Sequence, residues 1–248
     1  MDERSFKDEL HNASPEISIK KTGALAWFDN FWYHYKWHSI IALFVVFAIV
    51  VCSFQMCAKT SYDAFAVYAG PKEISHRTEN GEVEYMKFNS SLLQVSRDSN
   101  GDGEINVSLL DLFMLSSKEI EEAEKDDEIE VNYKLITNNN TTFNNIISKS
   151  DYYLFFLSSS LYTEFQYKFE GTVYFENLES YSSLGNHEYF DSSAIYLKST
   201  AFSTLPGFSD LPEDTVVCIR VRGYLESKSE KLQNEAKLML EKILTYGK

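Results

Sequence analysis

Cysteine is scarce in this chain of 248 residues. Its three cysteines are Cys52, Cys57 and Cys218, and the first two lie within or at the end of one long apolar run. A network of disulfides therefore cannot hold the rest of the chain together, which argues against a small disulfide-stabilised secreted scaffold. Cys218 lies in an apolar stretch and is predicted to be a buried apolar residue.

Basic residues are also few, with 23 Lys and Arg against 37 Asp and Glu. Residues 1–59 contain six of each sign, so the net charge of −14 belongs entirely to residues 60–248. Nucleic-acid binding needs clustered Lys and Arg to neutralise phosphates. We therefore expect no nucleic acid among the partners of this protein.

Catalytic signatures are missing. The sequence has no Gly-rich phosphate loop, no GxSxG elbow, no HExxH and no paired-cysteine metal motif. Beyond residue 60 the only histidines are His76 and His187, which lie far apart in polar surroundings. We therefore predict that the protein is not an enzyme and that replacing His76, His187 or Cys218 by Ala leaves its function intact. A hydrolase acting on the cell envelope is the catalytic alternative.

The most informative stretch that is present runs from Ser39 to Met56, eighteen residues without a charge. An apolar helix of about 20 residues crosses the hydrocarbon core of a bilayer. A buried core helix and a cleaved signal peptide are the alternatives. However, the stretch has almost no polar stripe, 38 residues precede it, and no A-x-A-like site follows it. We therefore predict a transmembrane helix over residues 39–57.

Aromatic residues crowd the segment before this helix, residues 27–38. Trp and Tyr favour the headgroup level of a membrane, where the ring is buried and its polar tip stays wet. We predict that the lipid bilayer is a partner and that five side chains form an aromatic belt at the membrane interface: Trp27, Trp32, Tyr33, Tyr35 and Trp37.

The orientation follows from positive charge near the helix. Three lysines, Lys20, Lys21 and Lys36, lie close on its N-terminal side, against Lys59 and Lys72 on the other. Cytoplasmic flanks carry the excess of Lys and Arg. We therefore expect a single-pass protein of the cell membrane, in which residues 1–26 form a mobile cytoplasmic tail and residues 60–248 an extracellular domain.

Residues 60–248 switch repeatedly between the apolar periods of strands and helices. This alternation predicts an α/β or α+β fold, with a mixed sheet, flanking helices and a long C-terminal helix. Strands are expected within residues 60–71, 129–137, 151–157, 171–178, 193–199 and 215–221. Helices are expected within residues 118–127, 141–150, 158–169 and 226–246, and residues 85–115 fit either a strand-turn-strand or a helix-turn-strand unit.

One segment has the spacing of a metal-binding loop. Asp98, Asn100 and Asp102 alternate along the chain and are followed by Gly103, Glu104 and Asn106. EF-hand loops place hard oxygen ligands for calcium in this way, with Glu104 supplying its main-chain carbonyl and Asn106 reaching the ion through water. Leu109 stands where an EF-hand has its bidentate Glu, so any Ca²⁺ site is weak. The alternative is a metal-free turn joining two elements.

The order of several segments resembles a family of uncharacterised, single-pass, membrane-anchored extracytoplasmic proteins of Firmicutes. The resemblance rests on residues 31–50 (FWYHYKWHSIIALFVVFAIV), then YDAFAVYAGP, DSNGDGEINV, SKSDYYLFFLSSSLY and LPGFSDLPEDTVVCIRV. It implies a bacterial membrane protein that faces outward and carries no known activity. SKSDYYLFFLSSSLY also looks like the strand-then-helix element with which type 2 solute-binding proteins hold ligands, an analogy of fold alone.

Together these observations predict a membrane-tethered extracytoplasmic domain that binds a small ligand or another envelope protein without catalysis. An accessory or assembly subunit of a membrane complex is the second hypothesis, in which the transmembrane helix and its aromatic collar make the contacts. A deep pocket with converging polar groups would favour the ligand, whereas a flat exposed aromatic patch would favour the partner protein.

Overall fold

The structure is a computed structural model that describes residues 23–57, 61–77, 83–84, 86–125, 131–166, 172–179, 187–223 and 230–247. The chain divides into two compact units, Met1–Lys59 and Thr60–Lys248. The predicted tail, residues 1–26, lies largely outside the described residues.

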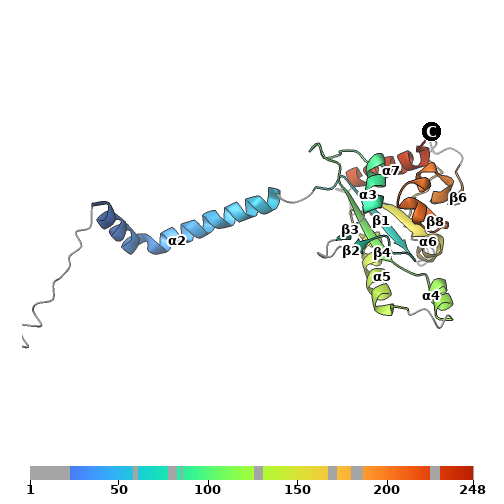
Figure 1. Ribbon diagram of the computed structural model, residues 1–248, viewed down its shortest axis with the longest axis horizontal. Coiled ribbons are helices and arrows are strands. Elements are labelled where there is room, and N and C mark those ends of the chain that lie inside the picture. Colours follow the sequence, from blue (N-terminus) through green and yellow to red (C-terminus); the bar gives the residue numbers. More distant parts are fainter. Residues whose placement is uncertain are drawn as a thin grey trace, which may run out of the picture. The chain divides into compact units, whose positions relative to one another are not determined.

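The first unit contains a single described helix, α2 (Gly23–Cys57), drawn in blue in Figure 1. Its 35 residues correspond to about 52 Å of helix, more than the roughly 30 Å of hydrocarbon in a bilayer. Within it, Trp27–Phe54 is long and apolar enough to cross a membrane, and none of its most apolar window is buried. The predicted aromatic segment and the predicted transmembrane helix are therefore parts of one continuous helix.

The second unit is built on a six-stranded mixed sheet in the order β4-β1-β5-β8-β7-β6. Its strands are β1 (Ala64–Gly70), β4 (Val107–Phe113), β5 (Leu154–Ser158), β6 (Tyr189–Asp191), β7 (Ala194–Tyr196) and β8 (Thr215–Ile219). β4, β1 and β5 are parallel, while β8 runs antiparallel to β5 and to β7. A separate two-stranded ladder pairs β2 (His76–Arg77) with β3 (Val83–Glu84).

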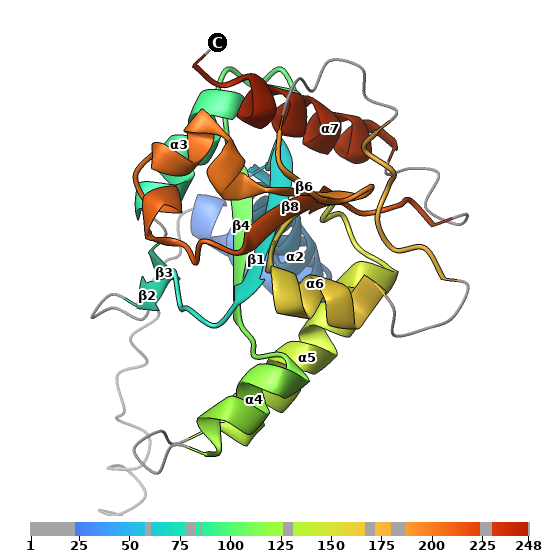
Figure 2. The ribbon, with the colours of Figure 1, turned by 90° about the vertical axis from the view of Figure 1, so that its right-hand side faces the viewer.

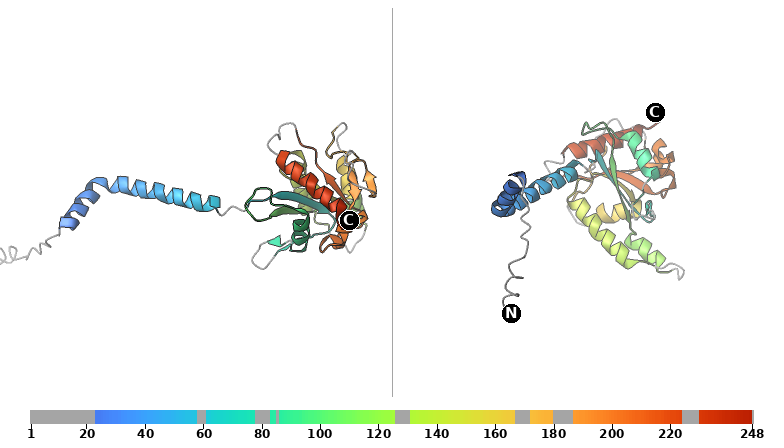
Figure 3. Two further views of the ribbon diagram at one scale, coloured as in Figure 1. Left: turned by 90° about the horizontal axis from the view of Figure 1, so that it is seen from above. Right: turned by 60° about the vertical axis from the view of Figure 1, so that its left-hand side comes forward.

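Helices cover both faces of the sheet, as Figures 2 and 3 show. One face carries α3 (Met86–Val95) and α7 (Glu230–Thr245), together with three short 3-10 helices, η1 (Leu197–Ser199), η2 (Ala201–Thr204) and η3 (Phe208–Asp210). The other face carries α5 (Tyr133–Ser148) and α6 (Ser159–Gln166), and α4 (Ser117–Ala123) follows β4. The predicted mixed sheet with flanking helices and a C-terminal helix is therefore confirmed.

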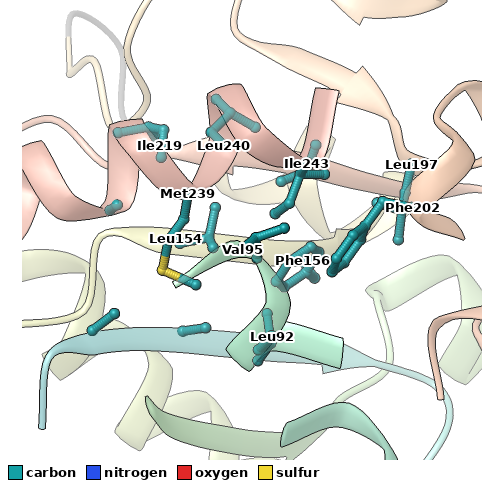
Figure 4. Packing of buried hydrophobic residues seen from close by; sticks show 14 of the residues in the cluster. Leu92, Val95, Leu154, Phe156, Leu197, Phe202, Ile219, Met239, Leu240 and Ile243 are labelled. Atoms are coloured by element: carbon teal, nitrogen blue, oxygen red, sulfur yellow. The ribbon is translucent and has the colours of Figure 1, made fainter. Parts of the chain in front are cut away.

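Two hydrophobic clusters fill the space between the sheet and its helices. Side chains such as Phe156, Leu92 and Met239 meet in the cluster beneath α3 and α7, seen in Figure 4. The opposite cluster joins Phe143 of α5 and Phe165 of α6 to the strands. Every member of both clusters belongs to residues 60–248, so this unit has a hydrophobic core of its own, as expected of a domain that can fold alone.

Two predicted strands are wrong. Residues 129–137 were expected to be a strand, but α5 begins at Tyr133, with the Asn132 side chain as N-cap accepting a hydrogen bond from Leu135 N–H at 3.0 Å. The expected strand over 171–178 is reduced, in its described part, to one bridge between Phe175 and Arg220. The helix expected within residues 118–127 is present as α4, and a capping box between Ser116 and Glu119 begins it.

Candidate functional site

The connections between the three parallel strands diverge at β1. The chain passes from β1 through α3 to β4 on one side, then through α5 to β5 on the other side of β1. α3 and α5 cover opposite faces of the sheet. In open α/β sheets, ligands bind beyond the carboxyl ends of the strands at such a divergence. A ligand-binding site is therefore expected at the carboxyl ends of β1, β4 and β5.

A cavity of about 490 Å³ lies at this edge. Residues 71–73, which follow β1, form one wall, and Phe113 and Leu115 at the end of β4 form another. The remaining wall comes from the start of α5 and includes Leu135 and Ile136. The volume falls within the range typical of small-molecule sites, about 300–1,000 Å³.

The cavity is apolar in its body and polar in three places. Lys72, Glu73 and Asn132 are the polar lining residues. The Lys72 ammonium donates a hydrogen bond to the main-chain carbonyl of Asp210 at 2.5 Å. Asn132 lies at the positive end of the dipole of α5, a sixteen-residue helix. The polar side of the cavity therefore presents positive potential from Lys72 and α5 beside the Glu73 carboxylate.

A row of polar side chains crosses the sheet beside this edge. Tyr68 of β1 is the register partner of Asp111 on β4, and Ser158 of β5 is the register partner of Thr215 on β8. Because side chains alternate along strands, all four lie on the face covered by α3 and α7. Three atoms of the row are buried and have no hydrogen-bond partner among the described residues: Tyr68 Oη, Asp111 Oδ1 and Thr215 Oγ1.

Burial changes the acidity of two groups in this row. The pKa of the Asp111 carboxyl is raised by its burial, although Oδ2 accepts hydrogen bonds from Ile74 N–H, Ser75 N–H and Ser75 Oγ that lower it in part. Burial also raises the pKa of the Tyr68 phenol. The main-chain N–H of Lys72 lowers the pKa of Tyr68 in part, although it does not reach hydrogen-bond geometry. The nearby negative charge of Asp111 raises this pKa further. Unpaired buried polar groups destabilise a fold, so their gathering near the carboxyl ends of the parallel strands marks this edge as a candidate site.

The strand-then-helix element β5–α6 does not offer a free anion site at the N-terminus of α6. The Asp214 carboxylate accepts hydrogen bonds from Ser159 N–H at 3.2 Å and from Ser159 Oγ at 2.8 Å. The N–H of Leu161 is directed at Ser158 Oγ. The protein's own carboxylate therefore occupies the position that an anionic ligand would take in the analogy with solute-binding proteins.

The predicted calcium residues lie together in the turn that enters β4. The Asp98 carboxylate accepts N–H groups from Gly101 and Gly103, which have φ values of 81° and 88°. Asn100 Oδ1 accepts from Asp102 N–H, and Asp102 Oδ1 accepts from Glu104 N–H. Within the part of the chain that the structure describes, no three His, Cys, Asp or Glu side chains are grouped closely enough to hold a metal. Weak calcium binding by this turn stays a prediction.

Asp63 is the organising residue of the turn, and sequence reasoning missed it. This buried carboxylate accepts hydrogen bonds from the N–H groups of Ser99, Asn100 and Asn106, at 2.8, 3.1 and 2.9 Å. Burial alone raises the pKa of Asp63, but these donors outweigh it, so the net pKa lies below 3.8. The only signal in the sequence was an acidic residue at the start of an otherwise apolar strand.

The predicted membrane-interface aromatics are all exposed on α2. Trp27 stacks on Phe31, and Phe31 stacks on Tyr35, with ring centroids 5.5 and 5.4 Å apart. The exposed fractions of the five predicted residues are 65% for Trp27, 45% for Trp32, 76% for Tyr33, 54% for Tyr35 and 68% for Trp37. Their placement in the helix fits a contact with lipid or with another protein.

Cys218 is fully buried on β8, and burial raises the pKa of its thiol well above the usual value. The prediction of an apolar packing role agrees with this position. The side chain of His76 lies outside the described residues.

Comparison with known proteins adds no relatives: the sequence matches no protein-family model, and neither a curated protein nor a solved structure was found to be similar to it.

Proposed function

We propose that the protein is a membrane-tethered, non-catalytic binding domain that holds a small amphiphilic ligand at the carboxyl edge of its parallel strands. The observation that carries this proposal is the 490 Å³ cavity beside the divergence of the β1 connections. Its apolar walls suit an apolar body, and its polar side suits a ligand end that is anionic or accepts hydrogen bonds.

The charges at the cavity support this choice of ligand. A ligand carboxylate or phosphate beside Lys72 and the N-terminus of α5 gains from both positive groups. Among the lining residues, only the Glu73 carboxylate would attract a cationic ligand. We therefore place the polar end of the ligand near Lys72 and its apolar chain against Phe113, Leu115 and Leu135.

The tether follows from α2, whose length and apolar surface suit a single membrane crossing. In this proposal the tail is cytoplasmic and residues 60–248 face outward, because the lysines lie mainly on the N-terminal side of the helix. Such an arrangement suits a receptor or carrier of envelope molecules, with the bilayer as a permanent partner.

An accessory subunit of a membrane complex is the second candidate, favoured by the exposed aromatic ladder of α2. In that case the essential contacts would be made by the helix, and changes in the cavity would leave function intact.

Three probes of equal chain length test the proposal: decanoate, decanol and decyltrimethylammonium, each titrated calorimetrically into residues 60–248. We expect decanoate to bind best and decyltrimethylammonium least. Leu135→Trp should fill the cavity and weaken decanoate binding by at least about tenfold. Lys72→Gln should weaken decanoate but not decanol.

Val173→Trp is the matched control, since Val173 is exposed and lines neither this cavity nor the groove along β4. Its affinity for decanoate should equal that of the wild type. The proposal would be overturned if none of the three probes bound. It would also be overturned if all three bound with equal affinity and Leu135→Trp left those affinities unchanged.

A further inference from the structure

The outer edge of β4 is open along its first half. β4 is the edge strand of the sheet, paired on one side with β1 only. Met114 N–H donates to Gly70 O, and Asn106 O accepts from Asp63 N–H, so even-numbered residues direct their main-chain groups toward β1. By alternation, the N–H and C=O groups of Val107, Leu109 and Asp111 point away from the sheet.

The second half of this edge is covered. Asn139 Nδ2 donates to the carbonyl of Phe113 at 2.9 Å, and residues 74–75 bind the Asp111 carboxylate. The opposite edge of the sheet ends in β6, a strand of three residues with an irregular register to β7. Short, irregular edges resist pairing with other chains, whereas seven regular residues do not. At Val107 and Leu109, no main-chain partner on the outer side is found among the described residues.

A groove of about 520 Å³ follows this open stretch and is lined by residues on both faces of the sheet. Asn89 and Leu93 of α3 line it on one face, and Tyr152, hydrogen-bonded to Ser108 Oγ, lines it on the other. Because the groove straddles the plane of the sheet, a strand lying in it would direct alternate side chains toward α3 and toward Tyr152. A groove built for a small ligand alone would have no reason to follow a strand edge.

Two further features define the occupant. Asn89 Oδ1 is buried and has no donor among the described residues, so an N–H group of an occupant would satisfy it. Two exposed carboxylates, Asp102 and Glu104, lie in the turn that leads into β4, while the neighbouring Arg97 is neutralised by Glu235 at 2.6 Å. The groove therefore favours a chain with positive charge at this end.

We propose that the open edge of β4 binds an extended, basic peptide segment of a partner protein, which adds a strand to the sheet at Val107 and Leu109. Main-chain hydrogen bonds supply affinity in this mode, and alternate side chains supply specificity. This surface is separate from the ligand cavity, since the two share no lining residue.

The test selects a random peptide library on residues 60–248 in parallel with the Val107→Pro variant. Proline removes an N–H that the fold does not use and prevents strand addition. We expect peptides with Lys or Arg and alternating β-branched residues to be enriched on the wild type only. In the best peptide, N-methylation of alternate amides should lower the affinity by at least about tenfold.

Leu93→Asp provides a second variant on the wall of the groove; because the side chain is already 38% exposed, we expect the fold to tolerate the charge. It should also weaken the peptide at least about tenfold, while Val173→Asp, at an exposed position elsewhere, should not. Glu104→Gln should weaken basic peptides in low salt. Enrichment that is equal on Val107→Pro, or affinity that survives N-methylation, would overturn the proposal. Dimerisation of the wild type that Val107→Pro abolishes would overturn it in favour of a second copy.

Discussion

Tyr68 and Gly70 form a tight contact at the end of β1. A Cβ added to Gly70 would lie 2.5 Å from Tyr68 Oη and 2.9 Å from Cζ. A larger residue at this position would have to displace the Tyr68 ring, so glycine is favoured by the close approach of the phenol. Since Tyr68 Oη has no hydrogen-bond partner among the described residues, the hydroxyl brings a desolvation cost to the folded state.

Tyr68→Phe should stabilise residues 60–248 by about 1 kcal/mol, because it removes an unpaired buried hydroxyl. Gly70→Ala should destabilise by about 2 kcal/mol in the wild type and by less in the Tyr68→Phe background, since the closest atom is then gone. Urea unfolding of the two single variants and the double variant measures both effects. A loss of stability on Tyr68→Phe would show that the hydroxyl is paired after all, with a bound molecule.

Asp63→Asn should destabilise the domain at pH 7 by at least about 2 kcal/mol, because an amide accepts the three main-chain N–H groups less well than a carboxylate. The folded-state pKa of Asp63 is lowered, so its stabilising effect is present above the ordinary pKa of 3.8 and disappears as the pH falls through the folded value. The difference between variant and wild type should therefore shrink at pH 3. Glu188→Gln serves as the control, and a difference independent of pH would contradict the argument.

At the scale of elements, the conformation of the turn between α3 and β4 is held by hydrogen bonds among its own residues. The side chains of Asp98, Asn100 and Asp102 each already accept a main-chain N–H, and Asp63 anchors the turn to β1. These bonds leave lone pairs on the same oxygens. The spacing of Asp98, Asn100 and Asp102 is therefore compatible both with a weak Ca²⁺ site and with a metal-free turn.

Weak calcium binding by this turn would stabilise the folded domain. With a Kd near 1 mM and about 10 mM Ca²⁺, the gain is roughly 1.4 kcal/mol, which raises the melting temperature by about 3–6 °C. Thermal melting in EDTA and in calcium measures it. Asp102→Asn keeps an acceptor for Glu104 N–H and should reduce the calcium effect without unfolding the turn. Equal melting temperatures in the two buffers would show that this segment is a metal-free turn.

Most elements could be predicted from apolar patterning, because α7 buries one face and β5 and β8 are apolar runs buried along their whole length. The second half of α5 lies in the helix predicted within residues 141–150, but its first half was missed because Val131, Tyr133 and Leu135 alternate as in a strand. The pairing of Tyr68 with Asp111 depends on the register of strands 43 residues apart. Local sequence patterns do not encode such a register, so this part of the site required the structure.

At the scale of the whole molecule, the lysine distribution predicts that residues 60–248 face outward and remain attached to α2. Protease added to intact protoplasts should release a fragment of about 21 kDa, the size of the second unit. A protected domain together with a cleaved tail would reverse the orientation. Detergent-lysed cells, in which both sides are accessible, provide the control.

The position of β1 gives the molecule a mechanical property. β1 is the first described strand after α2 and an interior strand of the sheet, flanked by β4 and β5. In the proposed membrane-tethered arrangement, tension between the membrane and a molecule bound by the domain would enter the fold along β1. The ladders on its two sides would resist such sliding together, whereas a tethered edge strand would be peeled off one hydrogen bond at a time. In that arrangement the domain would be attached to α2 through a strand that is hard to pull out.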